Sequence, residues 1–162
     1  MDPSLSSIAD DGQLLTFTLA GVDVSVANGL RRIILSEIPS LVFRTAPYEQ
    51  NKCEIRQNTT RLNNEIIKQR LSCIPIHVTD LSIPWDKFEV EVQKENTEFA
   101  PIIVTTEDFK IKDTSTGSYL SQADTQKIFP PDPITNDYIS FVRLRPKISE
   151  NGSGESIELT CK

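Results

Sequence analysis

Residues 23 to 39 have the sequence DVSVANGLRRIILSEIP, and the prediction of the fold starts from this stretch. Its apolar residues recur at the spacing of a helix with one apolar face. Ser25 is the expected N-cap, and Pro39 is expected to end the helix because proline has no backbone N–H to donate. We therefore predict an amphipathic helix whose apolar stripe consists of Val26, Leu30, Ile33, Ile34 and Ile38.

Other positions of this helix bear on function. Gly29 lies inside the helix, where glycine costs about 1 kcal/mol relative to alanine. Close approach of another helix and a simply tolerated glycine explain it about equally well. Leu35 beside Ile34 widens the apolar face enough to serve both an internal core and a partner. Arg31 and Arg32 project about 100° apart, so at least one leaves the stripe, either to be solvated or to contact a partner.

The regions on either side of this helix contain further signals. Residues 1–12 are small, polar and acidic and are expected to form a loose leader, whereas the alternation from Gln13 to Ala20 predicts a strand. Leu41 to Phe43 is expected to begin a second strand. A second helix is predicted after a cap at residues 58–60 and before Pro75, with the apolar residues Leu62, Ile66, Ile67 and Leu71.

The C-terminal half is predicted to be rich in strands. Alternation indicates a strand at Phe88 to Gln93, and a short apolar run indicates another at Ile102 to Val104. The prolines between residues 130 and 133 form a rigid connector and mark the best candidate for a domain boundary. Residues 138–144 and 157–161 are predicted to pair as a hairpin.

The composition favours a soluble intracellular protein that does not itself bind nucleic acid. The chain has 162 residues, a formal net charge of −6 and a pI near 4.8, whereas proteins that grip phosphate backbones need clustered Lys and Arg. Residues 1–11 lack both the basic start and the apolar core of a secretory signal, and no apolar run approaches the roughly 18 residues of a membrane span. We expect no membrane association.

Few residues could carry chemistry. Cys53, Cys73 and Cys161 are widely spaced and form no CxxC pair, so we expect reduced structural thiols and neither a disulfide framework nor a zinc site. His77 is the only histidine of the sequence, which removes most metal and acid–base constellations. We predict no catalytic residue, no metal and no cofactor. A small hydrolase that uses Cys53 or Cys73 is kept as an alternative.

Two blocks of sequence resemble a known family. The stretch from Asp23 to Pro39 resembles the first helix of the assembly subunits of multisubunit RNA polymerases, which are bacterial α, archaeal D and the third subunit of eukaryotic RNA polymerase II. The resemblance lies above all in Ala27-Asn28, Leu30-Arg31-Arg32 and Glu37-Ile38-Pro39. A second block, NTTRLNNE at residues 58–65 and RLSCIPI at residues 70–76, is similar to the archaeal and eukaryotic members. Residues 141–146, FVRLRP, are similar to the segment with which the family returns to its dimerization domain.

The resemblance implies an α+β fold in which a dimerization domain is interrupted by an inserted β-rich domain. The dimerization domain would comprise residues 10–47 and 137–162, and the insert residues 48–136. The family continues past this point into a long helix that completes the dimer core, so we expect the dimerization domain to be incomplete at its C-terminus. Some relatives carry a cysteine cluster in the insert that binds zinc or an iron–sulfur cluster. This chain lacks the cluster, which agrees with the expectation of no metal.

The resemblance also implies a function, that of a non-catalytic assembly scaffold of a DNA-directed RNA polymerase in transcription. Such a subunit pairs with a smaller homologous subunit and recruits the second-largest subunit; small accessory polymerase subunits are further expected partners, and direct DNA binding is not expected. The expected dimer interface consists of Val26, Asn28, Gly29, Leu30, Ile33 and Ile34, and the expected contacts with the large subunit are Arg31, Arg32 and Glu37.

The resemblance further suggests a location, the nucleus or a viral transcription compartment. The divergent sequence without a cysteine cluster would suit a large DNA virus that encodes its own polymerase. The alternative function is a freestanding β-rich protein-interaction module unrelated to transcription.

Overall fold

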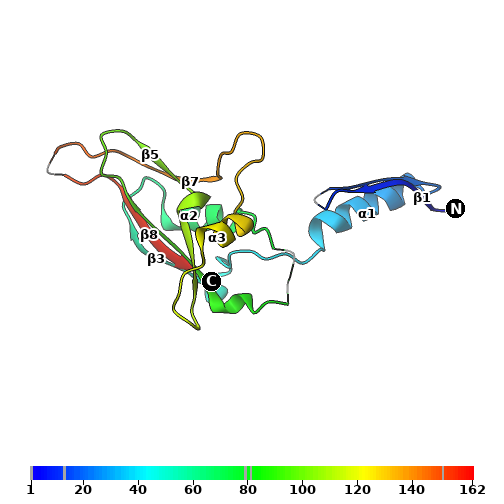
Figure 1. Cartoon of the computed structure of the whole chain (residues 1–162), viewed down its shortest axis with the longest axis horizontal. Coiled ribbons are helices and arrows are strands. Elements are labelled where there is room, and N and C mark those ends of the chain that lie inside the picture. The colour runs from blue at the N-terminus through cyan, green and yellow to red at the C-terminus, as the bar shows by residue number, and fades with distance from the viewer. Residues whose placement is uncertain (1, 13, 79, 81, 151) are drawn as a thin grey trace. The chain divides into compact units, whose positions relative to one another are not determined.

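The computed structural model describes residues 2–12, 14–78, 80, 82–150 and 152–162. The chain forms two compact units, residues 1–40 and residues 41–162 (Figure 1). Both helices and sheets are present, so the predicted α+β class is confirmed.

The N-terminal unit consists of a hairpin followed by a helix. Strand β1 (Ser4–Asp10) pairs antiparallel with β2 (Leu15–Ala20), and the register is irregular between Ser6 and Ala9. The strand predicted at residues 13–20 is therefore confirmed within the part that the structure describes. The loose leader predicted for residues 1–12 is wrong, because the backbone of β1 pairs with β2 although its side chains are mostly polar.

Helix α1 (Val24–Ser36) is the predicted amphipathic helix, but its N-cap differs from the prediction, and Ile38, predicted to belong to the stripe, lies beyond the last helical residue. Asp23 rather than Ser25 is the N-cap, since the Asp23 carboxylate accepts a hydrogen bond of 2.8 Å from the Ser25 N–H. Aspartate and serine are similarly good N-caps, so the sequence did not discriminate between Asp23 and Ser25. At the other end the Glu37 N–H donates to the Ile33 carbonyl at 2.8 Å.

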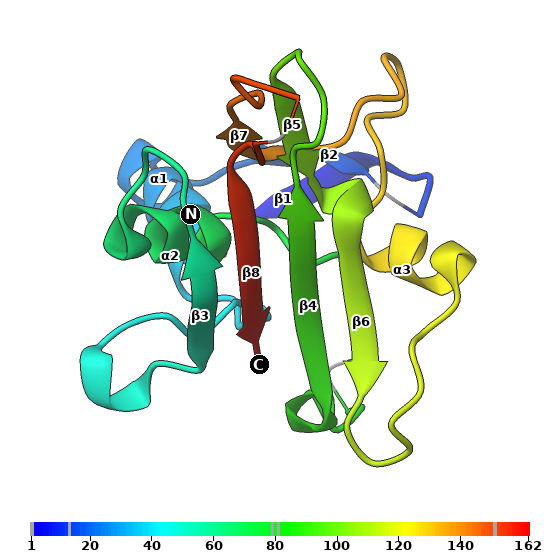
Figure 2. The ribbon, with the colours of Figure 1, turned by 90° about the vertical axis from the view of Figure 1, so that its left-hand side faces the viewer.

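The C-terminal unit is built on a four-stranded antiparallel sheet in the order β3-β8-β4-β6 (Figure 2). These strands are β3 (Cys53–Asn58), β8 (Ser156–Cys161), β4 (Phe88–Glu95) and β6 (Phe109–Asp113). A separate ribbon joins β5 (Ile102–Thr105) to β7 (Ser140–Leu144).

The hairpin predicted between residues 138–144 and 157–161 is wrong, although both strands exist. Strand β7 pairs with β5, while β8 lies between β3 and β4. Five of the six residues of β8 are buried, as expected for a strand with neighbours on both edges and cover on both faces. The sequence specifies that these segments are extended, and the partner of each is decided by long-range packing.

In the described part of this unit, three short helical segments and two α-helices connect the strands. Helix α2 (Asn64–Ser72) is capped by the Asn63 side chain, which accepts a hydrogen bond from the Ile66 N–H, and not by residues 58–60 as predicted. Helix α3 (Gln122–Ile128) was not predicted. The 3₁₀ turns are Tyr48–Gln50, Trp85–Lys87 and Thr106–Asp108.

An aromatic cluster lies at the centre of the core of this unit. The rings of Phe43 and Phe129 stack with centroids 6.1 Å apart, and Phe109 meets Phe129 and Phe141 edge to face, each at 5.5 Å. Phe43 belongs to an irregular segment, so the strand predicted at residues 41–43 is wrong. The segment is held to the core by the buried ring of Phe43 and not by hydrogen bonds to a neighbouring strand.

The packing of residues 137–162 differs from the predicted grouping with residues 10–47. In the structure β7 and β8 pair with strands of residues 48–136, inside the C-terminal unit. The prolines at residues 130–133 also lie within this unit, and the division of contacts falls at residue 40 instead. Strand β8 lies between β3 and β4, and most of its side chains are buried. Burial of these side chains is the physical reason why residues 156–161 pack within the C-terminal unit. The division into a dimerization domain and an insert stays a prediction.

Burial on α2 generates a first prediction. The side chain of Ile67 is 0% exposed, whereas that of its neighbour Ile66 is 39% exposed. Ile67→Ala is expected to lower the free energy of unfolding of this unit by about 2–5 kcal/mol, because it leaves a cavity in the core. Ile66→Ala, the matched control, should cost about 1 kcal/mol or less. Urea denaturation of the full chain measures both, and equal losses would contradict the packing described.

Candidate protein interface

The apolar stripe of α1 is exposed. Val26 and Leu30 are 44% and 46% exposed, and Ile33 and Ile34 are 54% and 56% exposed. Every described residue of this helix is at least partly accessible, so none of them is buried. The structure therefore places the four apolar residues predicted for the dimer interface on one exposed face of α1.

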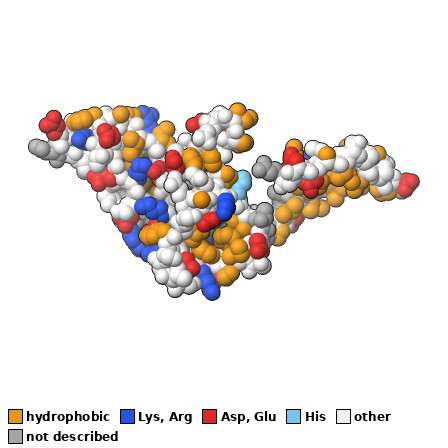
Figure 3. Space-filling model, in the orientation of Figure 1, with side chains coloured by type: hydrophobic (Ala, Val, Ile, Leu, Met, Phe, Trp, Pro, Cys, Tyr) orange, Lys and Arg blue, Asp and Glu red, His pale blue; other side chains and the backbone are white. Residues whose placement is uncertain are grey.

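The exposed apolar surface extends beyond α1 into the hairpin of the same unit. Leu5 and Ile8 of β1 and Phe17 of β2 are each about half exposed or more, and no described residue of residues 1–40 is buried. Figure 3 shows hydrophobic side chains along the lower edge of this unit. Sequence reasoning missed Leu5 and Ile8, because their strand is otherwise polar and they lack a regular period.

Gly29 has open space around it. A Cβ atom added at Gly29 would meet no atom within 4 Å, outside the backbone of its own helix turn. Within the described part of residues 1–40, therefore, no neighbouring element approaches the helix at this position.

The polar residues of α1 are arranged around the stripe. The Arg31 guanidinium donates two hydrogen bonds to the Asn28 side-chain oxygen, at 3.2 and 3.0 Å. Asn28 is two positions from both Val26 and Leu30, which places it about 160° around the helix from each. Asn28 and Arg31 thus lie on the side of α1 opposite the stripe, where Val24 and Leu35 are also exposed, and the membership of Asn28 in the dimer interface stays a prediction.

Arg32 is exposed, and no described residue makes a hydrogen bond or ion pair with its guanidinium. The Arg32 carbonyl accepts the Ser36 hydroxyl at 2.8 Å. Glu37 is the C-cap and is also exposed. All three charged residues predicted to contact the large subunit are accessible, and the contact itself stays a prediction.

The start of α1 is fixed by a charged cap. The Ser25 hydroxyl donates to the Asp23 carboxylate at 2.6 Å, in addition to the bond from the Ser25 N–H. These two bonds keep the pKa of Asp23 below its ordinary value. Asp23 is therefore ionised at neutral pH, and its negative charge is favourable at the positive end of the helix dipole.

The thiols are arranged as structural residues. Cys53 and Cys161 are both buried and lie opposite each other across β3 and β8. The hydrogen bond with Cys53 and burial raise the pKa of the Cys161 thiol. The same hydrogen bond lowers the pKa of the Cys53 thiol. Cys53 is nevertheless poorly suited to the hydrolase alternative, because its side chain is only 3% exposed and a substrate could not reach its sulfur. Cys73 is exposed at the end of α2.

Within residues 2–12, 14–78, 80, 82–150 and 152–162, no group of three or more His, Cys, Asp or Glu side chains could hold a metal ion. No described helix combines the length and the apolar character needed to cross a bilayer.

Comparison with known proteins assigns the family. The sequence profile of the RNA polymerase Rpb3/Rpb11 dimerisation domain matches residues 16–137, more than half of the chain. The chain therefore belongs to this family of RNA polymerase subunits, and the resemblance predicted from the two sequence blocks is confirmed.

Curated relatives agree with this assignment. The chain is similar to the DNA-directed RNA polymerases I and III subunit rpac1 of Dictyostelium discoideum, with 28% identity over 174 residues covering 97% of this chain and 45% of the relative. It is also similar to the archaeal DNA-directed RNA polymerase subunit Rpo3 of Pyrococcus horikoshii, with 39% identity over 77 residues, 48% of this chain and 25% of the relative. The DNA-directed RNA polymerases IV and V subunit 3B of Arabidopsis thaliana is 42% identical over 60 residues, 37% of this chain and 17% of the relative. The chain thus spans less than half the length of these relatives.

The open space at Gly29 generates a second prediction. Gly29→Ala is expected to stabilise α1 in the free chain by up to about 1 kcal/mol, because alanine is the better helix former and nothing in the chain obstructs its methyl group. Amide hydrogen exchange of residues 24–36 measures the effect. Ala27→Gly is the matched control and should destabilise the helix by a similar amount. Loss of protection in Gly29→Ala would show a close neighbour at this position.

Proposed function

We propose that this chain is a non-catalytic assembly subunit of a DNA-directed RNA polymerase, and that α1 pairs with a smaller homologous subunit. The observation that carries the proposal is the uncovered stripe of Val26, Leu30, Ile33 and Ile34 in a unit without a buried residue among those described. Membership of the Rpb3/Rpb11 dimerisation family supports it, because that family is described by its dimerisation domain.

The energetics favour a protein partner over exposure to water. Fully burying a leucine or isoleucine side chain contributes about 1.5–3 kcal/mol, so completing the burial of one that is half exposed contributes about 1 kcal/mol. Four such residues on one helix face, together with the apolar residues of the hairpin, provide several kcal/mol for association. Apolar surface of this kind on a small unit marks an interaction site.

Three charged residues of α1 and its C-cap are proposed to contact a different subunit. Arg31, Arg32 and Glu37 are accessible, and arginine is enriched among the residues that dominate binding energy at interfaces. We assign these residues to recruitment of the second-largest subunit, with small accessory subunits as further partners. The net charge of −6 agrees with a role in which other subunits hold the DNA.

The proposal extends to domain organisation and location. Residues 10–47 are proposed to belong to the dimerization domain, and residues 48–136 to the insert. Residues 137–162 are proposed to return to the dimerization domain, although β7 and β8 pair in the structure with strands that lie between residues 48 and 136. The subunit is proposed to act in the nucleus or in a viral transcription compartment.

Charge introduced into the stripe tests the pairing. Leu30→Glu combined with Ile34→Glu is expected to abolish co-purification with the smaller homologous subunit from the same organism, because two carboxylates would be buried without partners. The measurement is co-expression followed by size-exclusion chromatography. The unfolding midpoint of the C-terminal unit should stay unchanged, since all core residues described for that unit follow residue 40.

The control is Val24→Glu, at a residue of α1 that is 83% exposed and about 160° from Val26. It should leave the pairing intact. A monodisperse wild-type chain that is equally stable alone, or that purifies from its native source without polymerase subunits, would contradict the proposal and favour the freestanding β-rich module.

Removal of the two arginines tests recruitment. Arg31→Ala with Arg32→Ala is expected to weaken binding of the second-largest subunit about tenfold or more, as at an arginine hot spot, while pairing with the smaller subunit persists. Pull-down from the reconstituted pair measures the first effect and denaturation the second. If the double substitution lowers binding and folding stability equally, both arginines have a structural role and the recruitment proposal is wrong.

A further inference from the structure

An arginine-lined pocket lies in the C-terminal unit, and none of its lining residues belongs to the proposed interface on α1. Its volume is about 540 Å³, and its lining includes Arg61, Arg70, Arg143 and Arg145, with Glu155 as the acidic member. The whole chain has eight arginines and a net charge of −6, so half of its arginines are gathered in this one hollow. Such concentration of one sign of charge in an acidic protein points to an anionic ligand.

Separate elements bring these arginines together. Arg143 is in β7 and Arg145 follows two positions later, so both project to the side opposite the buried Val142 and Leu144. Arg70 comes from α2. Arg61 comes from the loop before α2, which completes the set.

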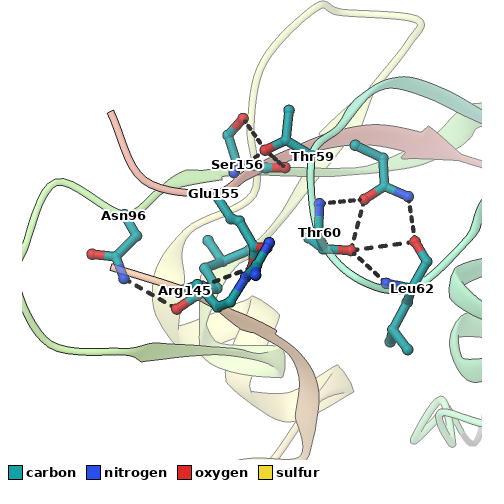
Figure 4. Close-up of polar contacts among 9 residues, drawn as sticks. Thr59, Thr60, Leu62, Asn96, Arg145, Glu155 and Ser156 are labelled. Carbon is teal, nitrogen blue, oxygen red and sulfur yellow. Dashed lines mark hydrogen bonds and ion pairs between the residues drawn. The ribbon is translucent and has the colours of Figure 1, made fainter. Parts of the chain in front are cut away.

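Hydrogen bonds hold the loop that carries Arg61. The Thr60 hydroxyl donates to the Asn58 side-chain oxygen at 2.7 Å, and the Asn58 amide donates to the Leu62 carbonyl at 2.8 Å. Thr59 bonds the backbone of Ser156 in β8 (Figure 4). The loop is therefore fixed to the sheet before any ligand arrives, which lowers the entropic cost of binding.

Two of the four arginines already have partners within the chain. The Arg70 guanidinium donates to the carbonyls of Phe141 and Ser140, at 2.6 and 3.1 Å. Arg145 forms an ion pair with Glu155, whose other oxygen accepts the Arg145 N–H at 2.8 Å (Figure 4). These contacts build the wall of the pocket and neutralise one of its charges.

The other two arginines have no partner among the described residues. No described residue makes a hydrogen bond or ion pair with the guanidinium of Arg61 or of Arg143, and both side chains are exposed. The apolar side chain of Ile103, 54% exposed, lies in the same lining. The free donors and the apolar residue together define what the pocket can bind.

We propose that this pocket binds an acidic segment of a partner polypeptide. Carboxylates of the segment pair with Arg61 and Arg143, since the planar guanidinium matches a carboxylate with two parallel hydrogen bonds. An apolar side chain of the segment contacts Ile103. The proposed peptide site lies only in the C-terminal unit, so a test of peptide binding is independent of the proposed pairing through α1.

Charge and shape favour a peptide over a nucleic acid. A nucleic acid would bring many phosphates near a protein of net charge −6, and binding of that kind needs a basic surface longer than one hollow. A few carboxylates on an extended peptide fit a pocket of this volume, and they meet the two free guanidinium groups without extending over acidic surface.

Fluorescence anisotropy on the full chain tests the proposal. The probe is a fluorescein-labelled peptide of glutamate and leucine, compared with a lysine and leucine peptide, single-stranded DNA of matched length and inorganic phosphate. We expect saturable binding of the acidic peptide alone. Arg61→Ala with Arg143→Ala should weaken it about tenfold or more, as for loss of charge-assisted hydrogen bonds, and Arg143→Lys should have a smaller effect.

The matched control is Arg56→Ala, on β3 outside the pocket, where Arg56 pairs with Glu158 at 3.4 Å. It should leave the affinity unchanged, and unfolding midpoints verify that every variant is folded. The proposal is overturned if the acidic peptide does not bind, or if Arg56→Ala weakens binding as much as the pocket variants do. Tighter binding of DNA than of the peptide, lost in the same variants, would also overturn it and assign the pocket to phosphates.

Discussion

Apolar side chains are buried in the C-terminal unit but exposed in the N-terminal unit. The stability of each unit and the proposed association of the chain depend on this difference in burial. Among the described residues, eighteen hydrophobic side chains are buried, and all of them belong to the C-terminal unit. The N-terminal unit has comparable apolar side chains on α1 and on the hairpin, but none of its described residues is buried. A unit of this size without a core is held by backbone hydrogen bonds and helix capping, which contribute little net stability in water.

The exposed apolar residues of the N-terminal unit agree with membership of a family described by dimerisation. A helix with an exposed apolar stripe gains free energy when another surface covers it, and the Rpb3/Rpb11 family is described by its dimerisation domain. The cap at Asp23 and the i to i+3 bond between Asn28 and Arg31 keep the helix formed while the stripe remains accessible. The chain thus presents a preformed helix rather than a segment that must fold on binding, which lowers the entropic cost of association.

The C-terminal unit owes its form to the placement of β8. This strand joins β3, about a hundred residues earlier, to β4, and its backbone also fixes the loop before α2 through Thr59. The loop, α2 and β7 together bring Arg61, Arg70 and Arg143 around one pocket. The stable sheet therefore holds the positively charged arginines close together although they repel one another. A bound carboxylate would offset this electrostatic repulsion.

The sequence by itself determined the local features whose signals lie within a few residues. The period of Val26, Leu30, Ile33 and Ile34 specified α1 and its apolar stripe, and the motif from Ala27 to Pro39 specified the family. Alternation specified β2, β4 and β7 as strands. These features follow from backbone periodicity and local sterics, which act on neighbouring residues and need no knowledge of the fold.

Tertiary structure alone decided which segments pair and which residues meet. The partners of β7 and β8, the grouping of residues 137–162, and the gathering of arginines from three elements depend on contacts between residues far apart in sequence. Strand pairing has no local signature, because any extended segment can hydrogen-bond to any other and the choice is made by the side chains that both must bury. The exposure of the α1 stripe was likewise invisible in the sequence, since a periodic apolar face looks the same whether the chain covers it or leaves it open.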